Sequence, residues 1–125
     1  MAAVLVGVSS PANADPHNIG WVWTTTAPSG GAGFFDADLA GYPSVEKLTV
    51  CDNKTDGHGV IATLYYAYLD GEPYEFRDSV KDPSNDGTCE HIAYNMAGEN
   101  YHVMIEVCEY WDTYIDHCAH DYGVA

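Results

Sequence analysis

The chain has very few basic residues. Only four of its 125 residues are Lys or Arg, against 19 Asp or Glu, and no Lys or Arg follows Lys81. The formal net charge is therefore -15 at pH 7, and such a surface repels nucleic-acid phosphates and anionic lipid head groups. The composition argues against a nucleic-acid or membrane-surface role and favours a basic partner.

Long hydrophobic runs are also missing. The longest apolar stretch, Ala2 to Val8, is about half the length that a bilayer span needs, so no membrane insertion is expected. It leads into Ala12-Asn13-Ala14, an A-x-A pattern typical of a secretory cleavage site, although the basic start of a signal is missing. We interpret residues 1–14 as the end of a signal peptide that begins upstream of Met1, and we expect a secreted, extracellular protein whose mature chain starts at Asp15.

The sequence contains no recognisable catalytic motif. G-x-S-x-G is absent, the serines have no neighbouring His signature, and any pair of carboxylates is unremarkable among nineteen acids. We therefore predict that the protein is not an enzyme and needs no cofactor.

Three segments resemble metal sites only in part. His117 and His120 flank Cys118, but an odd spacing in a strand points them to opposite faces. Asp15-Pro16-His17 resembles a copper or nickel motif, but Pro16 has no amide N–H to give up. The residues from Asp52 to Gly57 offer oxygen ligands without the length of an EF-hand loop, so a turn explains them better than calcium does. We predict no metal, with calcium at this turn as the lesser alternative.

What the sequence does contain is four cysteines, which in a secreted protein predict a disulfide framework. Three pairings are possible. Cys108 and Cys118 flank a predicted hairpin around Asp112-Thr113, which favours their pairing and leaves Cys51 for Cys89. On the loop-entropy model the longer bridge contributes about 4 kcal/mol and the shorter one about 3 kcal/mol.

From residue 45 onward the chain alternates short strand-like segments with turn signals. The turns carry Asp-Gly pairs at residues 56–57, 70–71 and 86–87. The expected strands are Glu46 to Asp52, Val60 to Leu69, Glu72 to Asp78, Thr88 to Asn95, Tyr101 to Tyr110 and Thr113 to Ala119. This spacing predicts an all-β fold: a small antiparallel β-sandwich or barrel of about six to seven strands, stapled by two disulfides, over residues 45–125.

Residues 15–44 are interpreted as an irregular, aromatic and glycine-rich N-terminal segment. Trp21 to Thr25 can form a strand, but Ala27 to Gly33 is expected not to, because its glycines favour a flexible connection. We predict that Trp21 to Phe35 docks a partner and lies outside the core. The alternative is that Trp21 and Trp23 belong to an edge strand that closes the sandwich.

Ten Tyr and three Trp exceed the needs of a small core and are favoured interface anchors. The strand from Val60 is apolar on both faces, so it is either covered on both sides or exposes Tyr65 to a partner. The predicted partner-binding residues are Trp21, Trp23, Gly30, Gly31, Gly33, Phe34, Phe35 and Tyr65.

Two stretches carry a family resemblance. Gly33-Phe34-Phe35 and the run from Glu46 to Val60 resemble a pattern in small secreted proteins of Streptomyces-type actinobacteria. Some of those look similar to the small linker subunits of antibacterial umbrella toxin particles, which join a lectin-bearing subunit to a toxin-bearing one. The resemblance implies an adaptor without catalytic activity.

The expected function is therefore a secreted protein-binding module, an adaptor whose partner is another secreted protein with a basic or aromatic-accepting cleft. An inhibitor that inserts a rigid loop into an extracellular hydrolase is one alternative, and the flexibility of the glycine stretch argues against it. A carbohydrate-binding module that uses Trp21, Trp23 or Trp111 is the other.

Overall fold

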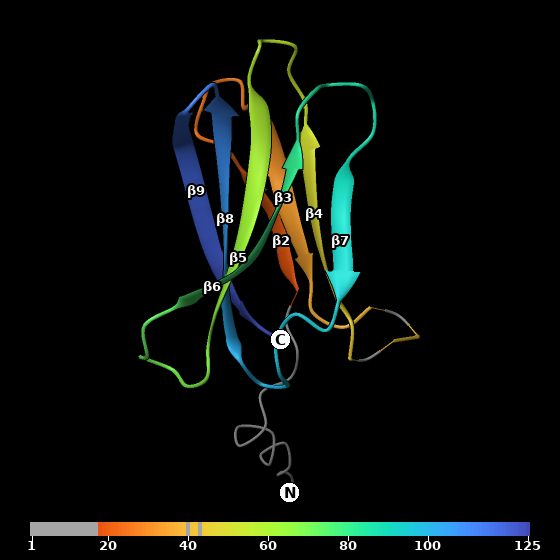
Figure 1. Cartoon of the computed structure of the whole chain (residues 1–125), viewed down its shortest axis with the longest axis vertical. Helices are drawn as coiled ribbons and strands as arrows, with labels where there is room; N and C mark the ends of the chain where they lie inside the picture. The colour runs from red at the N-terminus through yellow and green to blue at the C-terminus, as the bar shows by residue number, and fades with distance from the viewer. Residues whose placement is uncertain (1–17, 40, 43) are drawn as a thin grey trace, which may run out of the picture.

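The chain folds into two packed antiparallel sheets, as a computed structural model that describes residues 18–39, 41–42 and 44–125 shows (Figure 1). One sheet has the strand order β2-β3-β4-β7 and the other β6-β5-β8-β9. The strands are β2 (Ile19–Trp23), β3 (Gly31–Asp36), β4 (Glu46–Asp52), β5 (Gly59–Ala67), β6 (Glu75–Asp82), β7 (Glu90–Tyr94), β8 (His102–Trp111) and β9 (Tyr114–Val124). The predicted all-β class is confirmed, with eight strands in the described residues instead of six to seven.

Of the predicted strands, only β4 has its expected bounds, and two of the differing boundaries have clear reasons. Strand β6 begins at Glu75 and not at Glu72, because the turn after β5 continues past Gly71 with a backbone hydrogen bond from Glu72 N–H to the Leu69 carbonyl. Strand β9 continues to Val124, since it pairs with β8 along its whole length and His102 lies opposite Val124. The three Asp-Gly turns form, and their glycines adopt the positive φ angles that such turns require.

The prediction that residues 15–44 are irregular is wrong where β2 and β3 form. A Cβ atom on Gly31 would lie 2.3 Å from the Cys51 carbonyl oxygen, and one on Gly33 would lie 2.6 Å from Val107 Cγ2. These glycines let β3 lie close to its neighbours, so they serve close packing and not flexibility. Residues 1–17, which include the predicted signal peptide and the start at Asp15, lie outside the described residues.

The core lies between the two sheets and includes residues of both N-terminal strands. Its largest side chains come from both layers: Ile19, Phe35, Leu48, Val50, Val60, Leu64, Val103, Ile105 and Val107. Because Phe35 is fully buried and Val22 faces inward from β2, the prediction that Trp21 to Phe35 lies outside the core is wrong. The edge-strand alternative is correct, since β2 closes one side of the sandwich.

Both preferred disulfides are confirmed. Cys51 pairs with Cys89 and Cys108 pairs with Cys118. The hairpin between β8 and β9 has a two-residue turn, with Trp111 opposite Tyr114 and a left-handed Asp112. A bulge opposite Cys108 lets His117 adopt a positive φ and brings the two cysteines face to face.

Each disulfide joins neighbouring strands of one sheet. Cys51 lies on β4 and Cys89 just before β7, which pairs with β4, whereas Cys108 and Cys118 lie on β8 and β9. The two sheets are therefore held together by the core and by loops, not by a covalent link between layers.

No helix in the described residues is long and apolar enough to cross a membrane. The two disulfides are consistent with an extracellular protein, because disulfides persist in oxidising compartments.

Candidate functional site

The predicted partner-binding residues divide into surface and buried groups. Trp21 and Trp23 are exposed, while Phe34 and Tyr65 are half-buried on outer faces. The remaining four, Gly30, Gly31, Gly33 and Phe35, are buried. These four present little surface to a partner, so the prediction of partner binding now rests on Trp21, Trp23, Phe34 and Tyr65.

The surface members from β2 and β3 form a continuous aromatic area, which we call the tryptophan patch: Trp21, Trp23 and Phe34. Trp21 is 50% and Trp23 52% exposed, because alternate residues of β2 point away from the core. The ring centroids of Trp21 and Trp23 are 6.3 Å apart, and those of Trp21 and Phe34 are 5.4 Å apart. An open hollow of about 270 Å³ is lined by both tryptophans, Ala32, Asn53 and the Cys51–Cys89 disulfide.

A second aromatic area lies on the outer face of the other sheet. We call it the tyrosine row: Phe76, Tyr65, Met104 and Tyr122. These residues lie directly opposite one another across β6, β5, β8 and β9. Phe76 and Tyr122 are more than half exposed, and Tyr65 donates a 3.4 Å hydrogen bond to Glu106. Burial, reinforced by the Glu106 charge, raises the pKa of Tyr65, so its hydroxyl remains a donor.

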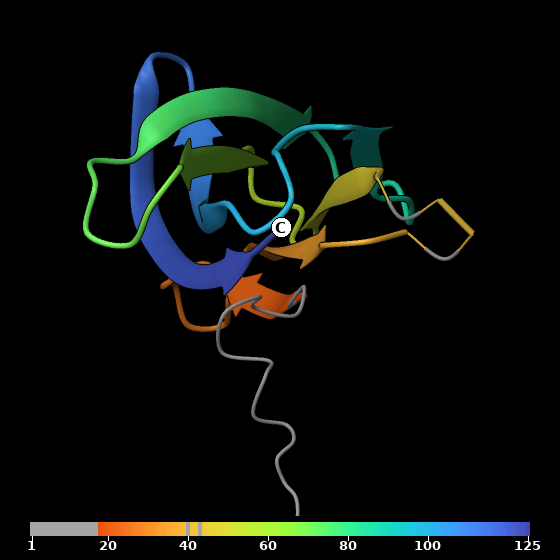
Figure 2. The ribbon, with the colours of Figure 1, turned by 90° about the horizontal axis from the view of Figure 1, so that it is seen from below.

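The two areas lie on different sheets. Figure 2, which looks along the sandwich from one end, shows the strands of both sheets arranged around the core, with β9 curving from its own sheet towards β2. The tryptophan patch and the tyrosine row lie on the outer surfaces of these sheets, so one molecule presents two separate aromatic surfaces.

The sequence did not reveal a buried carboxylate network beneath the loop between β2 and β3. Glu109 is 0% exposed. Its Oε2 accepts hydrogen bonds from Thr24 Oγ1 at 2.8 Å and Thr26 Oγ1 at 2.5 Å, and its Oε1 lies 3.1 Å from His58 Nδ1. Burial alone raises the pKa of Glu109, but the hydrogen bonds from Thr26, His58 and Thr24 outweigh it and hold the pKa below its usual value.

This network holds the loop in place. Gly30 N–H donates to Thr24 Oγ1 and Thr26 Oγ1, and a Cβ atom on Gly30 would lie 2.7 Å from the Glu109 carboxylate. The segment that we expected to be flexible is therefore anchored on a buried charge. Glu109 lies in β8, and only the fold brings Thr24 and Thr26 to its carboxylate.

Trp111 is not an open stacking platform. Its ring stacks on His58 with centroids 4.0 Å apart, and His117 and Tyr114 each lie 5.9 Å away. The part of the sugar-binding alternative that relied on Trp111 is therefore disfavoured, and only Trp21 and Trp23 offer exposed indole rings.

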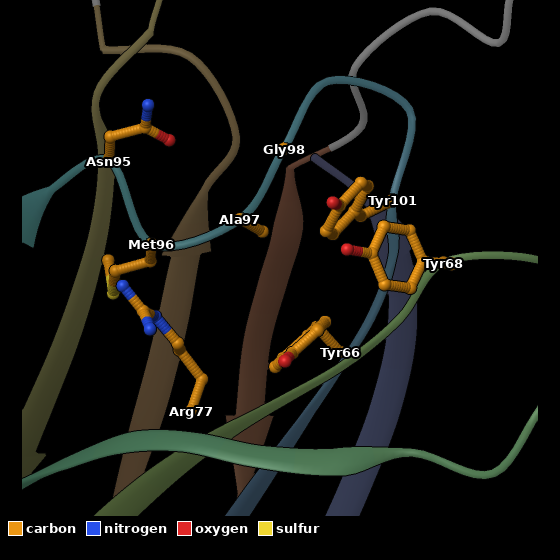
Figure 3. Close-up of a pocket in the computed structure, with 8 residues that line it drawn as sticks. All are labelled: Tyr66, Tyr68, Arg77, Asn95, Met96, Ala97, Gly98 and Tyr101. Atoms are coloured by element: carbon orange, nitrogen blue, oxygen red, sulfur yellow. The ribbon is translucent and has the colours of Figure 1, made fainter.

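A third feature, which we call the tyrosine cleft, is an open cleft of about 270 Å³ at the end of the sandwich drawn lowest in Figure 1. Figure 3 shows Tyr66, Tyr68 and Tyr101 gathered on one side, with Arg77 beneath Met96 on the other. The Tyr66 and Tyr101 rings stack with centroids 5.8 Å apart. Sequence reasoning missed this cleft because its residues come from β5 and the turn after it, from β6, and from the connection between β7 and β8.

Two of the three partial metal motifs make other contacts, and Asp15-Pro16-His17 lies outside the described residues. Asp52 Oδ1 accepts Lys54 N–H, and Asp56 Oδ1 accepts His58 N–H, which are the hydrogen bonds of a turn. His117 stacks against Trp111, whereas His120 meets the ring of Tyr122 edge-on.

The fold and these surfaces define the class as a disulfide-stapled all-β sandwich with an aromatic area on each outer face. No known protein family matches the chain, and no curated protein or solved structure is significantly similar to it.

Proposed function

We propose that this protein is a secreted, non-catalytic adaptor that binds one partner protein on each outer face. The observation that carries the proposal is the pair of separate aromatic surfaces, the tryptophan patch and the tyrosine row. An adaptor needs two surfaces that can be occupied at once, whereas an inhibitor needs one loop.

The chemistry of both surfaces favours protein partners. Exposed Trp and Tyr side chains supply large apolar contact area at a low entropy cost and are frequent interface anchors. The chain as a whole is strongly negative, since it carries 19 acids and four bases. A partner with aromatic-accepting clefts and a basic rim would complement it.

The resemblance to actinobacterial linker subunits agrees with this proposal. In that case one partner is a lectin-bearing subunit and the other is a toxin-bearing subunit of an extracellular particle. The two disulfides favour the extracellular location that such a role requires.

The test is affinity capture from culture supernatant of the source organism with three immobilised variants. Trp21→Ser/Trp23→Ser removes the tryptophan patch, Phe76→Ser/Tyr122→Ser interrupts the tyrosine row, and Leu69→Ser replaces an apolar side chain that is 64% exposed and lies outside both areas. We expect two captured proteins, each lost with a different double variant and both retained by the control. Loss of the same protein with both variants, or of neither, contradicts the adaptor.

An inhibitor is the second candidate, and one observation favours it. The loop between β2 and β3 is anchored on Glu109, so the argument from flexibility against an inhibitor does not hold. Thr25, Ala27 and Pro28 are exposed at its tip. If the captured protein is a hydrolase whose activity falls on binding, and if neither double variant affects the capture, the inhibitor replaces the adaptor.

The hollow beside Trp21 and Trp23 also contains Asn53, a combination of ring and amide that suits a sugar. Adding soluble cell-wall saccharides during capture distinguishes a protein-binding patch from a carbohydrate-binding patch. Release of the partner by saccharide assigns the tryptophan patch to a carbohydrate and not to a protein surface.

A further inference from the structure

Three carboxylates converge at the end of the sandwich that also holds the tyrosine cleft. Asp38 follows β3, Glu46 is the first residue of β4, and Glu99 lies in the connection between β7 and β8. One carboxylate oxygen from each lies within 4.8 Å of the other two. In the described part of the chain no Lys or Arg forms a salt bridge with any of them, since the ion pairs found there involve only His58.

Glu46 is the buried carboxylate of this group. It is 0% exposed, and its Oε1 accepts the N–H groups of Met96 at 2.6 Å and Ala97 at 3.0 Å. Its Oε2 and the Oδ1 of Asp38 are buried and have no hydrogen-bond partner among the described residues. A buried carboxylate oxygen without a partner is costly, so such groups in native proteins usually meet a donor or a cation.

We propose that Asp38, Glu46 and Glu99 bind a calcium ion. Carboxylate oxygens are the ligands that Ca²⁺ prefers, and the ion accepts six to eight oxygens in a flexible arrangement, with water completing the shell. Mg²⁺ demands a stricter octahedron and dehydrates reluctantly, which fits three carboxylates from separate segments less well. Glu99 is exposed, so the site opens to solvent on its side.

A bound ion would fix more than the three carboxylates. Glu46 already holds the backbone of Met96 and Ala97, which line the tyrosine cleft (Figure 3). Calcium would tie this connection, through Glu99, to the segment between β3 and β4. The sequence analysis predicted no metal. It could not reveal this site, because Asp38, Glu46 and Glu99 are too far apart in the sequence to form a motif.

A proton is the competing occupant. Burial raises the pKa of Glu46, the Ala97 and Met96 N–H groups lower it, and the charges of Asp38 and Glu99 raise it further, with a net increase. A proton on Glu46 and a calcium ion would relieve the same repulsion, so the experiment must separate them.

The experiment measures the melting temperature of the full chain at pH 7 in EDTA, in 1 mM CaCl₂ and in 1 mM MgCl₂, together with calcium titration calorimetry. We expect Ca²⁺ to raise the melting temperature by roughly 5 °C or more and Mg²⁺ to raise it less. Glu99→Gln changes an exposed residue and should fold normally while weakening Ca²⁺ binding at least about tenfold. Asp56→Asn, which removes a carboxylate from the turn at the other end of the sandwich, should leave the response unchanged.

Glu46→Gln distinguishes the cation from the proton. We expect this variant to melt at a higher temperature than the natural chain in EDTA, because one charge is gone, and to have lost its response to Ca²⁺. The proposal is overturned if the natural chain does not respond to Ca²⁺ while Glu46→Gln is stabilised, since a proton then occupies the site. It is equally overturned if Glu99→Gln responds like the natural chain or if Asp56→Asn abolishes the response.

Discussion

A substitution at Gly33 tests whether this glycine serves close packing or flexibility. A Cβ atom there would lie 2.6 Å from Val107 Cγ2 and 3.3 Å from Ala62 Cβ. We expect Gly33→Ala to destabilise the fold by about 1–3 kcal/mol through overpacking. Gly20→Ala is the matched control, because a Cβ atom at Gly20 meets nothing within 4 Å. Urea denaturation measures both, and equal stabilities would show that β3 does not pack as described.

Glu109 provides the second residue-level prediction. Glu109→Gln keeps the size of the side chain but loses the charge that Thr24, Thr26 and His58 surround. We expect a loss of about 1–3 kcal/mol at pH 7, the range for hydrogen bonds to a buried charged group. Glu75→Gln, at an exposed position of β6, serves as the control and should change stability little.

The lowered pKa of Glu109 determines how the effect of Glu109→Gln on stability changes with pH. Because the pKa of Glu109 in the folded chain lies below the ordinary value of 4.5, its contribution is fully present above that value and is lost as pH falls towards the folded pKa. The difference between the natural chain and Glu109→Gln should therefore be largest at neutral pH and shrink below pH 4.5. A difference that grows in acid would contradict the network.

At the level of single elements, sequence patterns located the strands from residue 45 onward but misjudged β3. Strand β4 was predicted with its observed bounds, because Leu48 and Val50 alternate with polar residues before an Asp-Gly turn. Strand β3 was missed because the same glycines that signal flexibility in sequence also permit close approach, and the facing side chains of Val60 and Val107 are known only from the fold. Local pattern cannot distinguish these two uses of glycine.

The same limit applies to the sites. Parity along β5 identified Tyr65, but its neighbours in the tyrosine row depend on the register of three strand pairs. The Glu109 network and the three-carboxylate site join residues that are far apart in the chain. Sequence alone gives no register and no distances, so it gave the residue types of these sites without their arrangement.

The element-level prediction concerns β2 and β3. A chain that begins at Asp36 lacks the buried Ile19, Val22 and Phe35 and leaves β4 as an unpaired edge. We expect it to show no cooperative melt, because these strands complete the core. A second pair tests this without truncation: Val22→Ala should destabilise the domain, whereas Trp21→Ala should not. A cooperative melt in the truncated chain would restore the earlier view that this segment only docks a partner.

On the scale of the whole molecule, stability rests on a single core and two covalent links within sheets. On the loop-entropy model, Cys51→Ser/Cys89→Ser should cost about 4 kcal/mol and Cys108→Ser/Cys118→Ser about 3 kcal/mol. Their sum is comparable to the net stability of a domain of this size. Full reduction should therefore abolish the cooperative thermal transition seen by circular dichroism, and an unchanged melting temperature after reduction would show that the core alone suffices.

The central claim is that one molecule binds two partners at once, on the outer faces of its two sheets. The most direct measurement is the mass of the complex that this chain forms with both captured partners, determined by size-exclusion chromatography with light scattering. The account predicts a single species with the summed mass of all three chains, reduced to one or the other binary complex by Trp21→Ser/Trp23→Ser or Phe76→Ser/Tyr122→Ser. Displacement of one partner by the other would contradict it, because the two faces would then be a single site.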